Sequence, residues 1–148
     1  MQSRTLVLPA LLLCSFLAAS VRDACAANPV TRPADWRAIR SVITSQLEAF
    51  NRGDAVGAFL LAAPSVRKRY RSAHEFMTMV RADYGPIYRP RSVALLDHFM
   101  VARQAVQPLR VVTQRRDILI AYYVMQRQQD GSWKIAGCAL HRGRRILA

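Results

Sequence analysis

The sequence predicts an α+β domain in which N-terminal helices pack on one face of a strongly curved antiparallel sheet of about four strands. Three observations favour this class. Apolar residues recur every three or four positions before Pro90, the period of a helix, and every second position after it, the period of a strand. Residues 118–125 are apolar on both faces of one predicted strand, so a curved sheet or a second subunit has to cover the outer face.

Residues 1–26 are predicted to be a secretory signal peptide. A positively charged start is followed by an apolar run, Thr5 to Ser20, and by small residues that end at Ala26. Because Pro9 interrupts the run, and because it is shorter than the roughly 20 residues that span a bilayer, we do not expect it to anchor the chain. We therefore expect an exported protein, periplasmic or secreted after cleavage near Ala26.

The chain is strongly basic, and arginine supplies nearly all of the positive charge. The whole sequence has 22 Lys and Arg against 9 Asp and Glu, and without residues 1–26 the balance is 20 against 8, a net charge of +12. In a cytosolic protein this would indicate nucleic acid. Behind a signal peptide, an anionic envelope component or an acidic partner fits better, and nucleic acid is not expected. The alternative is that the charge only keeps the protein soluble.

Cleavage would also leave Cys138 as the one cysteine, so no internal disulfide is expected. Cys138 lies in a strand-like run between Gly137 and Ala139. This position favours a small buried hydrophobic residue over a reactive thiol, which would need a base and an electropositive pocket.

The division of the chain follows from its prolines and its periodicity. Residues 27–33 are expected to form an extended lead-in, residues 34–142 a single α+β domain, and residues 143–148 a basic tail. The first helix is predicted to begin with Asp35 as its N-cap and to end at Gly53, which can adopt the left-handed conformation. Its buried stripe consists of Trp36, Ile39, Val42, Ile43, Leu47 and Phe50.

Shorter helices follow, each with its own signal. Asp54 can cap a helix that runs through Phe59 and Leu61, and Pro64 interrupts this helix. Ser72 and Glu75 form a capping box that begins a third helix. The buried stripe of the third helix is Phe76, Met79, Val80 and Tyr84, and a connector over residues 85–90 ends the helical part of the chain.

Four strands are predicted after Pro90, over residues 91–103, 105–114, 117–128 and 132–141. The third strand carries alternating sets of apolar residues, with Ile118, Ile120, Tyr122 and Val124 on one face and Leu119, Ala121, Tyr123 and Met125 on the other. A sheet covered on one side only should alternate apolar with polar residues. We therefore predict a homodimer through the sheet, with closure of the curved sheet on itself as the alternative.

The last two strands meet at an Asp130-Gly131 turn. A two-residue loop would place Arg127 opposite Lys134, a like-charge pair. A three-residue loop, with Gly131 in the left-handed conformation, places Arg127 opposite Trp133, where the guanidinium can stack on the indole. We choose this second register, which also pairs Met125 with Ile135 and Tyr122 with Cys138. The turn and its arginine–tryptophan stack are therefore interpreted as structural features and not as a binding site.

Several motifs occur in an order and spacing shared with a known family, over roughly residues 34–141. They include Gln46-Leu47-Glu48-Ala49-Phe50, Gly53-Asp54-Ala55, Tyr88-Arg89-Pro90 and Asp130-Gly131-Ser132-Trp133-Lys134-Ile135. Together they resemble the domain of unknown function 4864 family of exported bacterial proteins. The resemblance implies the nuclear-transport-factor-2-like cone, in which helices close over a curved sheet and leave an apolar pocket. It implies no catalytic residues, because this superfamily includes enzymes and non-catalytic binding domains.

Candidate site residues are few. His98 is a weak catalytic candidate, since an inward-facing histidine can act as acid or base near neutral pH, whereas the adjacent Asp97 must face the other side of a strand. The ligand-pocket candidates are Tyr84, Tyr88, His98 and Tyr122, and the anion-patch candidates are Arg67, Lys68, Arg69 and Arg71. No metal-ligand spacing, glycine-rich phosphate loop or serine elbow is found, so no metal and no cofactor are predicted.

These observations predict an exported, non-catalytic cone domain that binds a small molecule or an anionic partner. One alternative is a small lyase, isomerase or hydrolase that uses His98 or an inward carboxylate. Another is a structural, dimeric envelope module. The lining of the cone discriminates between these three interpretations. A carboxylate or His98 that faces a cavity would favour the enzyme, whereas an apolar or filled interior would favour binding or a structural role.

Overall fold

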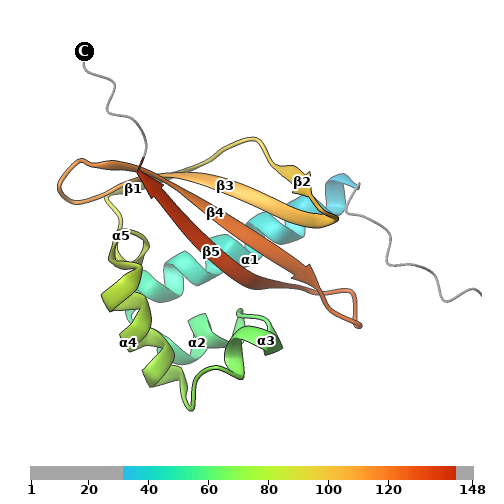
Figure 1. The fold of residues 1–148 in the computed structure, drawn as a ribbon, viewed down its shortest axis with the longest axis horizontal. Coiled ribbons are helices and arrows are strands. Elements are labelled where there is room, and N and C mark those ends of the chain that lie inside the picture. The colour runs from blue at the N-terminus through green and yellow to red at the C-terminus, as the bar shows by residue number, and fades with distance from the viewer. Residues whose placement is uncertain (1–31, 143–148) are drawn as a thin grey trace, which may run out of the picture.

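The computed structural model describes residues 32–142, and the predicted signal peptide and basic tail lie outside them. Five helices come first in this part of the chain: α1 (Pro33–Arg52), α2 (Ala55–Leu60), α3 (Pro64–Arg67), α4 (Ala73–Asp83) and α5 (Gly85–Tyr88). The strands follow: β1 (Ser92–Leu95), β2 (Phe99–Val101), β3 (Gln104–Val112), β4 (Ile118–Arg127) and β5 (Trp133–Arg142) (Figure 1). The predicted α+β class, with helices followed by a curved antiparallel sheet, is confirmed.

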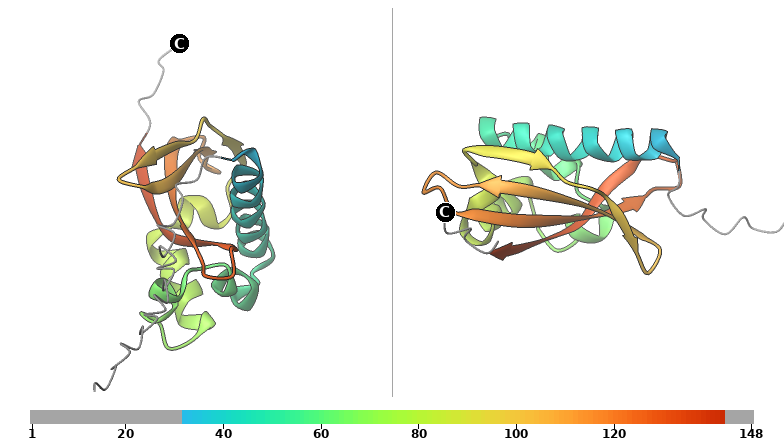
Figure 2. Two further views of the ribbon diagram at one scale, coloured as in Figure 1. Left: turned by 90° about the vertical axis from the view of Figure 1, so that its right-hand side faces the viewer. Right: turned by 90° about the horizontal axis from the view of Figure 1, so that it is seen from above.

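The long helix α1 covers the inner face of the sheet, and α2, α3 and α4 gather at one end of it (Figure 2). The predicted apolar stripe of α1 supplies the centre of the core, where Ile39, Ile43 and Phe50 are 0–1% exposed. Leu109 of β3 and Ala121 of β4 are also buried and belong to the same hydrophobic core. Burial of each large side chain contributes roughly 1.5–3 kcal/mol, so this layer contact accounts for much of the fold's stability.

The sheet has the order β1-β3-β4-β5, with β2 also paired to β3, and every pair is antiparallel. The predicted strand over residues 91–103 is thus two strands, interrupted at residues 96–98. Opposite the interruption lies Pro108, which accepts a hydrogen bond from Leu96 N (3.0 Å) but has no N–H to return. The fully buried Gln107 side chain donates instead to Leu96 O (2.7 Å), which holds the interruption in place.

The N-terminus of α1 differs from the prediction. The helix begins at Pro33, and its N-cap is Arg32, not Asp35, so Pro33 belongs to the helix and not to the predicted lead-in. Proline suits the first helical position, where its missing N–H is not needed. Asp35 lies in the first turn and is 7% exposed, with its carboxylate 3.2 Å from Arg32 Nε and 4.0 Å from Arg127 Nη2. It therefore ties α1 to the β4–β5 hairpin.

The other predicted helix signals are mostly confirmed. Gly53 ends α1 with a φ of 69°, and Asp54 Oδ1 accepts a hydrogen bond from Gly57 N (2.8 Å) at the start of α2. Ser72 Oγ accepts from Glu75 N (3.1 Å) at the start of α4. The reciprocal bond of the capping box is shifted by one residue, because Glu75 Oε2 accepts from Arg71 N (2.8 Å).

The β4–β5 turn has the predicted register over its first rungs, with Arg127 opposite Trp133 and Met125 opposite Ile135. Gly131 has a φ of 82°, and the Arg127 guanidinium lies 6.0 Å from the Trp133 ring centre. Beyond Met125 the predicted pairing is wrong, because a β-bulge shifts the register and places Tyr122 opposite Ala139.

The bulge coincides with a contact between the helical end and the edge of β5. The segment between α2 and α3 forms a parallel bridge there, in which Ile135 N donates to Leu61 O (3.0 Å) and Ala63 N donates to Ile135 O (2.8 Å). Lys134 Nζ donates to Leu60 O (2.8 Å) beside it. This bridge covers a strand edge that would otherwise expose its backbone groups.

The outer face of the sheet is partly open in the single chain. A line of rings crosses it, in which Phe99 lies 6.4 Å from Tyr122 and Tyr122 lies 5.5 Å from His141 between ring centres. Phe99 is 40% exposed and Ile118 is 37% exposed. Apolar side chains on this face therefore remain in contact with solvent.

We expect Asp35→Asn to lower the free energy of unfolding at neutral pH by about 1 kcal/mol, because it removes a charged acceptor from Arg32 and Arg127. The hydrogen bond from Arg32 and the surrounding positive charge hold the pKa of Asp35 below its ordinary value of 3.8. The stabilisation is therefore complete above pH 3.8 and is lost as the pH falls through the lowered pKa.

Urea unfolding at a series of pH values measures this effect. The acid-induced loss of stability should be smaller in Asp35→Asn than in the unmodified protein. Asp83→Asn, the same change at an exposed carboxylate, serves as the control. Equal pH dependence in Asp35→Asn and the unmodified protein would contradict the assignment.

Candidate functional site

A cavity of about 100 Å³ lies between the helices and β5, at the C-terminal half of α1. Its wall is mainly apolar and aromatic, and it is formed by Phe50, Val66, Phe76, Met79, Val80, Ile87 and Ile135. Phe76 contacts Phe59 and Tyr70, with ring centres 5.4 and 5.5 Å away, so the helical side of the wall is firmly packed. The cavity is small, with room for a few water molecules.

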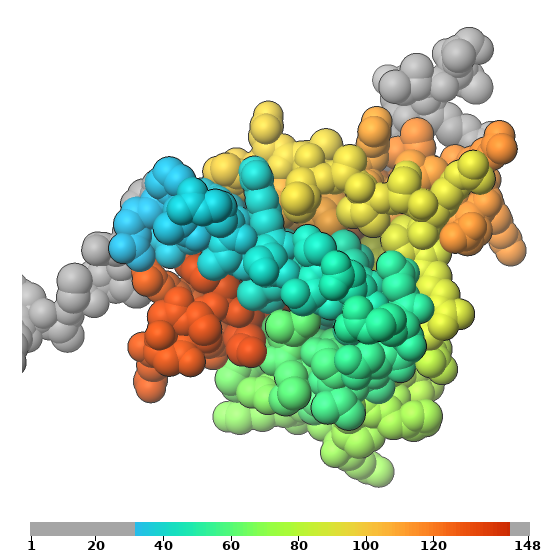
Figure 3. Space-filling model, turned by 180° about the vertical axis from the view of Figure 1, so that it is seen from behind, coloured from blue at the N-terminus to red at the C-terminus, as the bar shows by residue number. Residues whose placement is uncertain are grey.

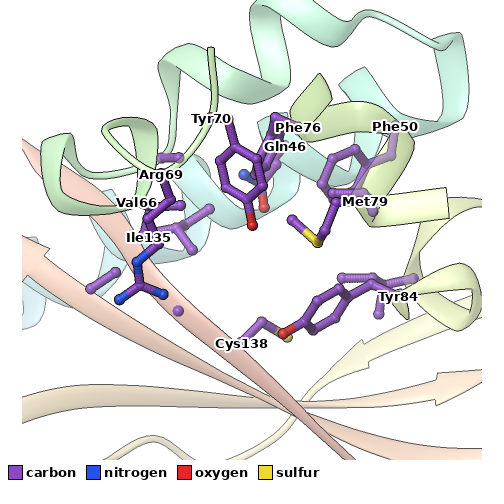
Figure 4. A pocket seen from close by; sticks show the side chains of 15 residues that line it. Gln46, Phe50, Val66, Arg69, Tyr70, Phe76, Met79, Tyr84, Ile135 and Cys138 are labelled. Atoms are coloured by element: carbon purple, nitrogen blue, oxygen red, sulfur yellow. The ribbon is translucent and has the colours of Figure 1, made fainter. Parts of the chain in front are cut away.

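A few polar groups project into this apolar space. The hydroxyls of Tyr70 and Tyr84 point into it, the Cys138 sulfur lies beside the Tyr84 hydroxyl, and the Arg69 guanidinium lies at another edge (Figure 4). Gln46 completes the set from α1, and its position is fixed because Nε2 donates to Ala58 O (3.2 Å). Convergent polar groups in an apolar cavity are typical of small-molecule sites.

The acidic groups of the cavity are held in their neutral forms. Burial raises the pKa of the Cys138 thiol to about 12, far above the range in which a thiolate acts as a nucleophile. Burial, with a smaller contribution from Cys138, also raises the pKa of Tyr84. Among the described residues that line the cavity there is no histidine and no carboxylate. Arg69 is therefore its one permanent charge.

A row of polar side chains crosses the inner face of the sheet toward this cavity. Gln107, Tyr123 and Cys138 occupy directly paired positions on β3, β4 and β5. The Tyr123 hydroxyl and Gln107 Oε1 are buried without a hydrogen-bond partner, and burial raises the pKa of Tyr123 well above its ordinary value. Only Cys138 of this row reaches the cavity, so Tyr123 belongs to the layer behind its wall.

The structure separates the four ligand-pocket candidates that the sequence predicted. Tyr84 lines the cavity. Tyr88 instead packs near Phe50 and carries the guanidinium groups of Arg81 and Arg89 at 5.0 and 5.1 Å from its ring centre.

His98 and Tyr122 also lie away from the cavity. His98 stacks on Trp36 at the surface, and Tyr122 lies on the outer face of the sheet. Tyr88, His98 and Tyr122 therefore do not share this cavity with Tyr84. His98 lies outside the strands, so the expected strand alternation did not apply to it.

The predicted anion patch is likewise divided. Lys68 and Arg71 are exposed, whereas Arg67 is half-buried and its Nε is enclosed without a partner. Arg69 reaches the cavity, as does the neighbouring Tyr70, which the sequence analysis did not single out. Gln46 was also missed, although it is a polar residue on the buried side of α1, between Ile43 and Phe50. A polar residue on the buried side of a predicted helix was the sequence signal that could have identified Gln46.

The described elements thus define an α+β fold with a small, polar-edged cavity between its helices and its sheet. The sequence matches the family described as Domain of unknown function (DUF4864) over residues 32–146, and the chain belongs to this family. The resemblance carried by its motifs is confirmed.

The chain is also similar to solved structures. The chain is similar to an NTF-2-like protein of unknown function from Burkholderia xenovorans LB400, at 11% sequence identity and a TM-score of 0.47, over 77% of this chain and 89% of that chain. No curated protein matches the chain.

Two further findings concern residues 32–142. Within this range no helix is long and apolar enough to cross a membrane. Nor does the same range contain a group of three or more His, Cys, Asp or Glu side chains that could hold a metal ion.

We expect Cys138 to resist alkylation in the folded full chain. A pKa of about 12 in place of 9.0 lowers the thiolate fraction about a thousandfold at mildly alkaline pH. Mass spectrometry of the Cys138 peptide after iodoacetamide treatment measures this. The same peptide in urea-unfolded protein is the control and should be fully modified. Equal rates in the two states would contradict a buried, protonated thiol.

Proposed function

We propose that this protein is exported and binds a small carboxylate in the cavity without transforming it. The observation that carries the proposal is the composition of the lining, in which one guanidinium and two phenols face an apolar and aromatic wall. The guanidinium of Arg69 is a forked donor that matches a carboxylate, and the hydroxyls of Tyr70 and Tyr84 can donate further hydrogen bonds.

The size and polarity of the cavity restrict the ligand. A volume of about 100 Å³ restricts the ligand to a small acid with a ring or a branched aliphatic chain, and it excludes a nucleotide or a sugar chain. The apolar body of such an acid would contact Phe50, Phe76 and Met79, which line the cavity. Its carboxylate would then lie toward Arg69.

The catalytic alternative lacks support at this cavity. A lyase, isomerase or hydrolase of the expected kind needs a base that titrates near neutral pH. His98 lies at the surface, and neither a histidine nor a carboxylate lines the cavity among the described residues. The thiol of Cys138 and the phenol of Tyr84 have raised pKa values, which disfavours either as a base.

We predict that benzoate raises the melting temperature of the full chain more than benzamide, its neutral analogue of similar shape. Arg69→Gln should weaken benzoate binding about tenfold, because one charge-assisted contact is lost. Arg71→Gln removes the same charge two residues away, outside the cavity lining, and should bind normally. Calorimetric titration measures both affinities. Equal binding of benzamide and benzoate would contradict the role of Arg69.

We also propose that a second copy of the chain covers the outer face of the sheet. The exposed Phe99, Val101 and Ile118, at 40%, 52% and 37%, support this, together with the half-buried Tyr122 and Val124 on the same sheet. The strands are apolar on both faces, whereas the helices cover only the inner one. A self-complementary patch on a sheet face is suited to a two-fold dimer.

Sedimentation velocity at micromolar concentration should therefore give a dimer. Ile118→Arg should convert it to a monomer, because it places a charge on the proposed interface. Val56→Arg makes the same change at a 61% exposed valine of α2 and should leave the dimer intact. A monomer for the unmodified protein would overturn the proposal.

A further inference from the structure

A second polar site lies at the N-terminal half of α1, at the other end of this helix from the cavity. Trp36 of α1 and His98 of the β1–β2 segment stack face to face, with ring centres 3.8 Å apart and an angle of 27° between the rings. Arg40 Nη2 lies 3.4 Å from His98 Nδ1. An open groove of about 350 Å³ is lined by Pro33, Trp36, Arg37, Arg40 and His98. In Figure 3 this half of α1 lies directly against the β1–β2 segment.

The fold holds these groups in place before any ligand arrives. The segment that carries His98 is fixed at Leu96, whose carbonyl accepts from the fully buried Gln107 and whose N–H donates to Pro108 O. Trp36 is only 8% exposed and belongs to the hydrophobic core, so the floor of the groove is rigid. Trp36 and Arg40 are four residues apart and therefore share one side of α1.

The hydrogen-bonding chemistry of the groove is one-sided. Arginine has only donors, so the contact between Arg40 and His98 requires that Nδ1 of the imidazole accepts. In the neutral ring the proton then sits on Nε2, which becomes a donor as well. Trp36 offers at most an indole N–H, and Pro33 offers no side-chain polar group. The polar side chains that line the groove therefore all present donors to it.

The positive charge of the groove is also unbalanced. No ion pair among the described residues includes Arg37 or Arg40. The nearby Asp35 is occupied by Arg32 and Arg127, and Asp97, beside His98 in the sequence, forms no ion pair with either groove arginine. A ligand with negative charge and several hydrogen-bond acceptors would balance the charge of the groove and also accept hydrogen bonds from its donors.

We propose that this groove is a binding site for a phosphomonoester group. Arg37 and Arg40 hold two of its oxygens with their guanidinium groups, and His98 donates from Nε2 to the third. A dianionic phosphate matches two arginines better than a singly charged carboxylate does, which distinguishes this site from the cavity. The phosphate can belong to a soluble monoester or to the headgroup of phosphatidic acid.

Titration of the full chain with inorganic phosphate tests the site, with sodium chloride at equal ionic strength as the reference. NMR should show saturable shifts of the Trp36 indole N–H and of the His98 ring. Arg37→Gln and Arg40→Gln should each weaken phosphate binding about tenfold. Arg110→Gln, the same change at an exposed arginine of β3, should bind within about twofold of the unmodified protein.

Co-sedimentation with phosphatidylcholine vesicles that contain phosphatidic acid distinguishes the two sources of the phosphate. Vesicle binding that depends on Arg37 and Arg40 supports the lipid headgroup, and phosphate binding without vesicle binding supports a soluble monoester. Among the described residues the hydrogen bond to His98 comes from Arg40 and not from Arg37, so the Arg37 variant remains informative even if Arg40→Gln disturbs the ring stack. Shifts that do not saturate, or equal losses in Arg110→Gln and Arg37→Gln, would overturn the proposal.

Discussion

The packing of α1 against the inner face of the sheet is the contact on which the rest of the structure depends. Ile39 and Ile43 are completely buried in the core between the helix and the sheet, and Phe50 extends the same core toward the smaller helices. A curved sheet of this size would expose its inner apolar residues to water without the helix. Removing these side chains from water makes the main favourable contribution to the free energy of folding. Their close packing also fixes the distance between the two layers.

The cavity follows from how the two layers separate at one end. Near the C-terminal half of α1, residues of the short helices line the cavity together with α1 and β5, and the bridge to Ile135 fixes the strand beside the bulge. Side chains alternate between the faces of a strand, so the extra residue of the bulge decides which residues beyond it face inward. Cys138 consequently pairs with Tyr123 and faces the cavity. A regular hairpin would have paired it with Tyr122 on the outer face.

Charge is distributed around this core in an uneven way. The one well-buried carboxylate, that of Asp35 among the described residues, is shared by Arg32 and Arg127 and serves the contact between helix and hairpin. The chain has a large excess of arginine, and within residues 32–142 several guanidinium groups form no ion pair. Arg69 at the cavity and Arg37 with Arg40 at the groove are such groups, and both places set them against aromatic side chains. Anion binding is the chemistry that we propose for both places.

The sequence by itself determined the features that depend on neighbouring residues. The stripe of α1, the caps at Asp54 and Ser72, and the glycine conformations at Gly53 and Gly131 involve interactions across four residues or fewer. The pairing of Arg127 with Trp133 followed from the same local turn geometry.

Only the tertiary structure decided the features that join distant segments. The strand interruption needs Gln107 opposite Leu96, the bulge lies where residue 61 meets residue 135, and the start of α1 involves Arg127. The site was therefore predicted in part: Tyr84 and Arg69 reach the cavity, whereas Tyr88, His98 and Tyr122 lie elsewhere. Periodicity shows which residues of a segment share a face, but the cavity depends on which faces meet in space, and that is set by packing between the layers.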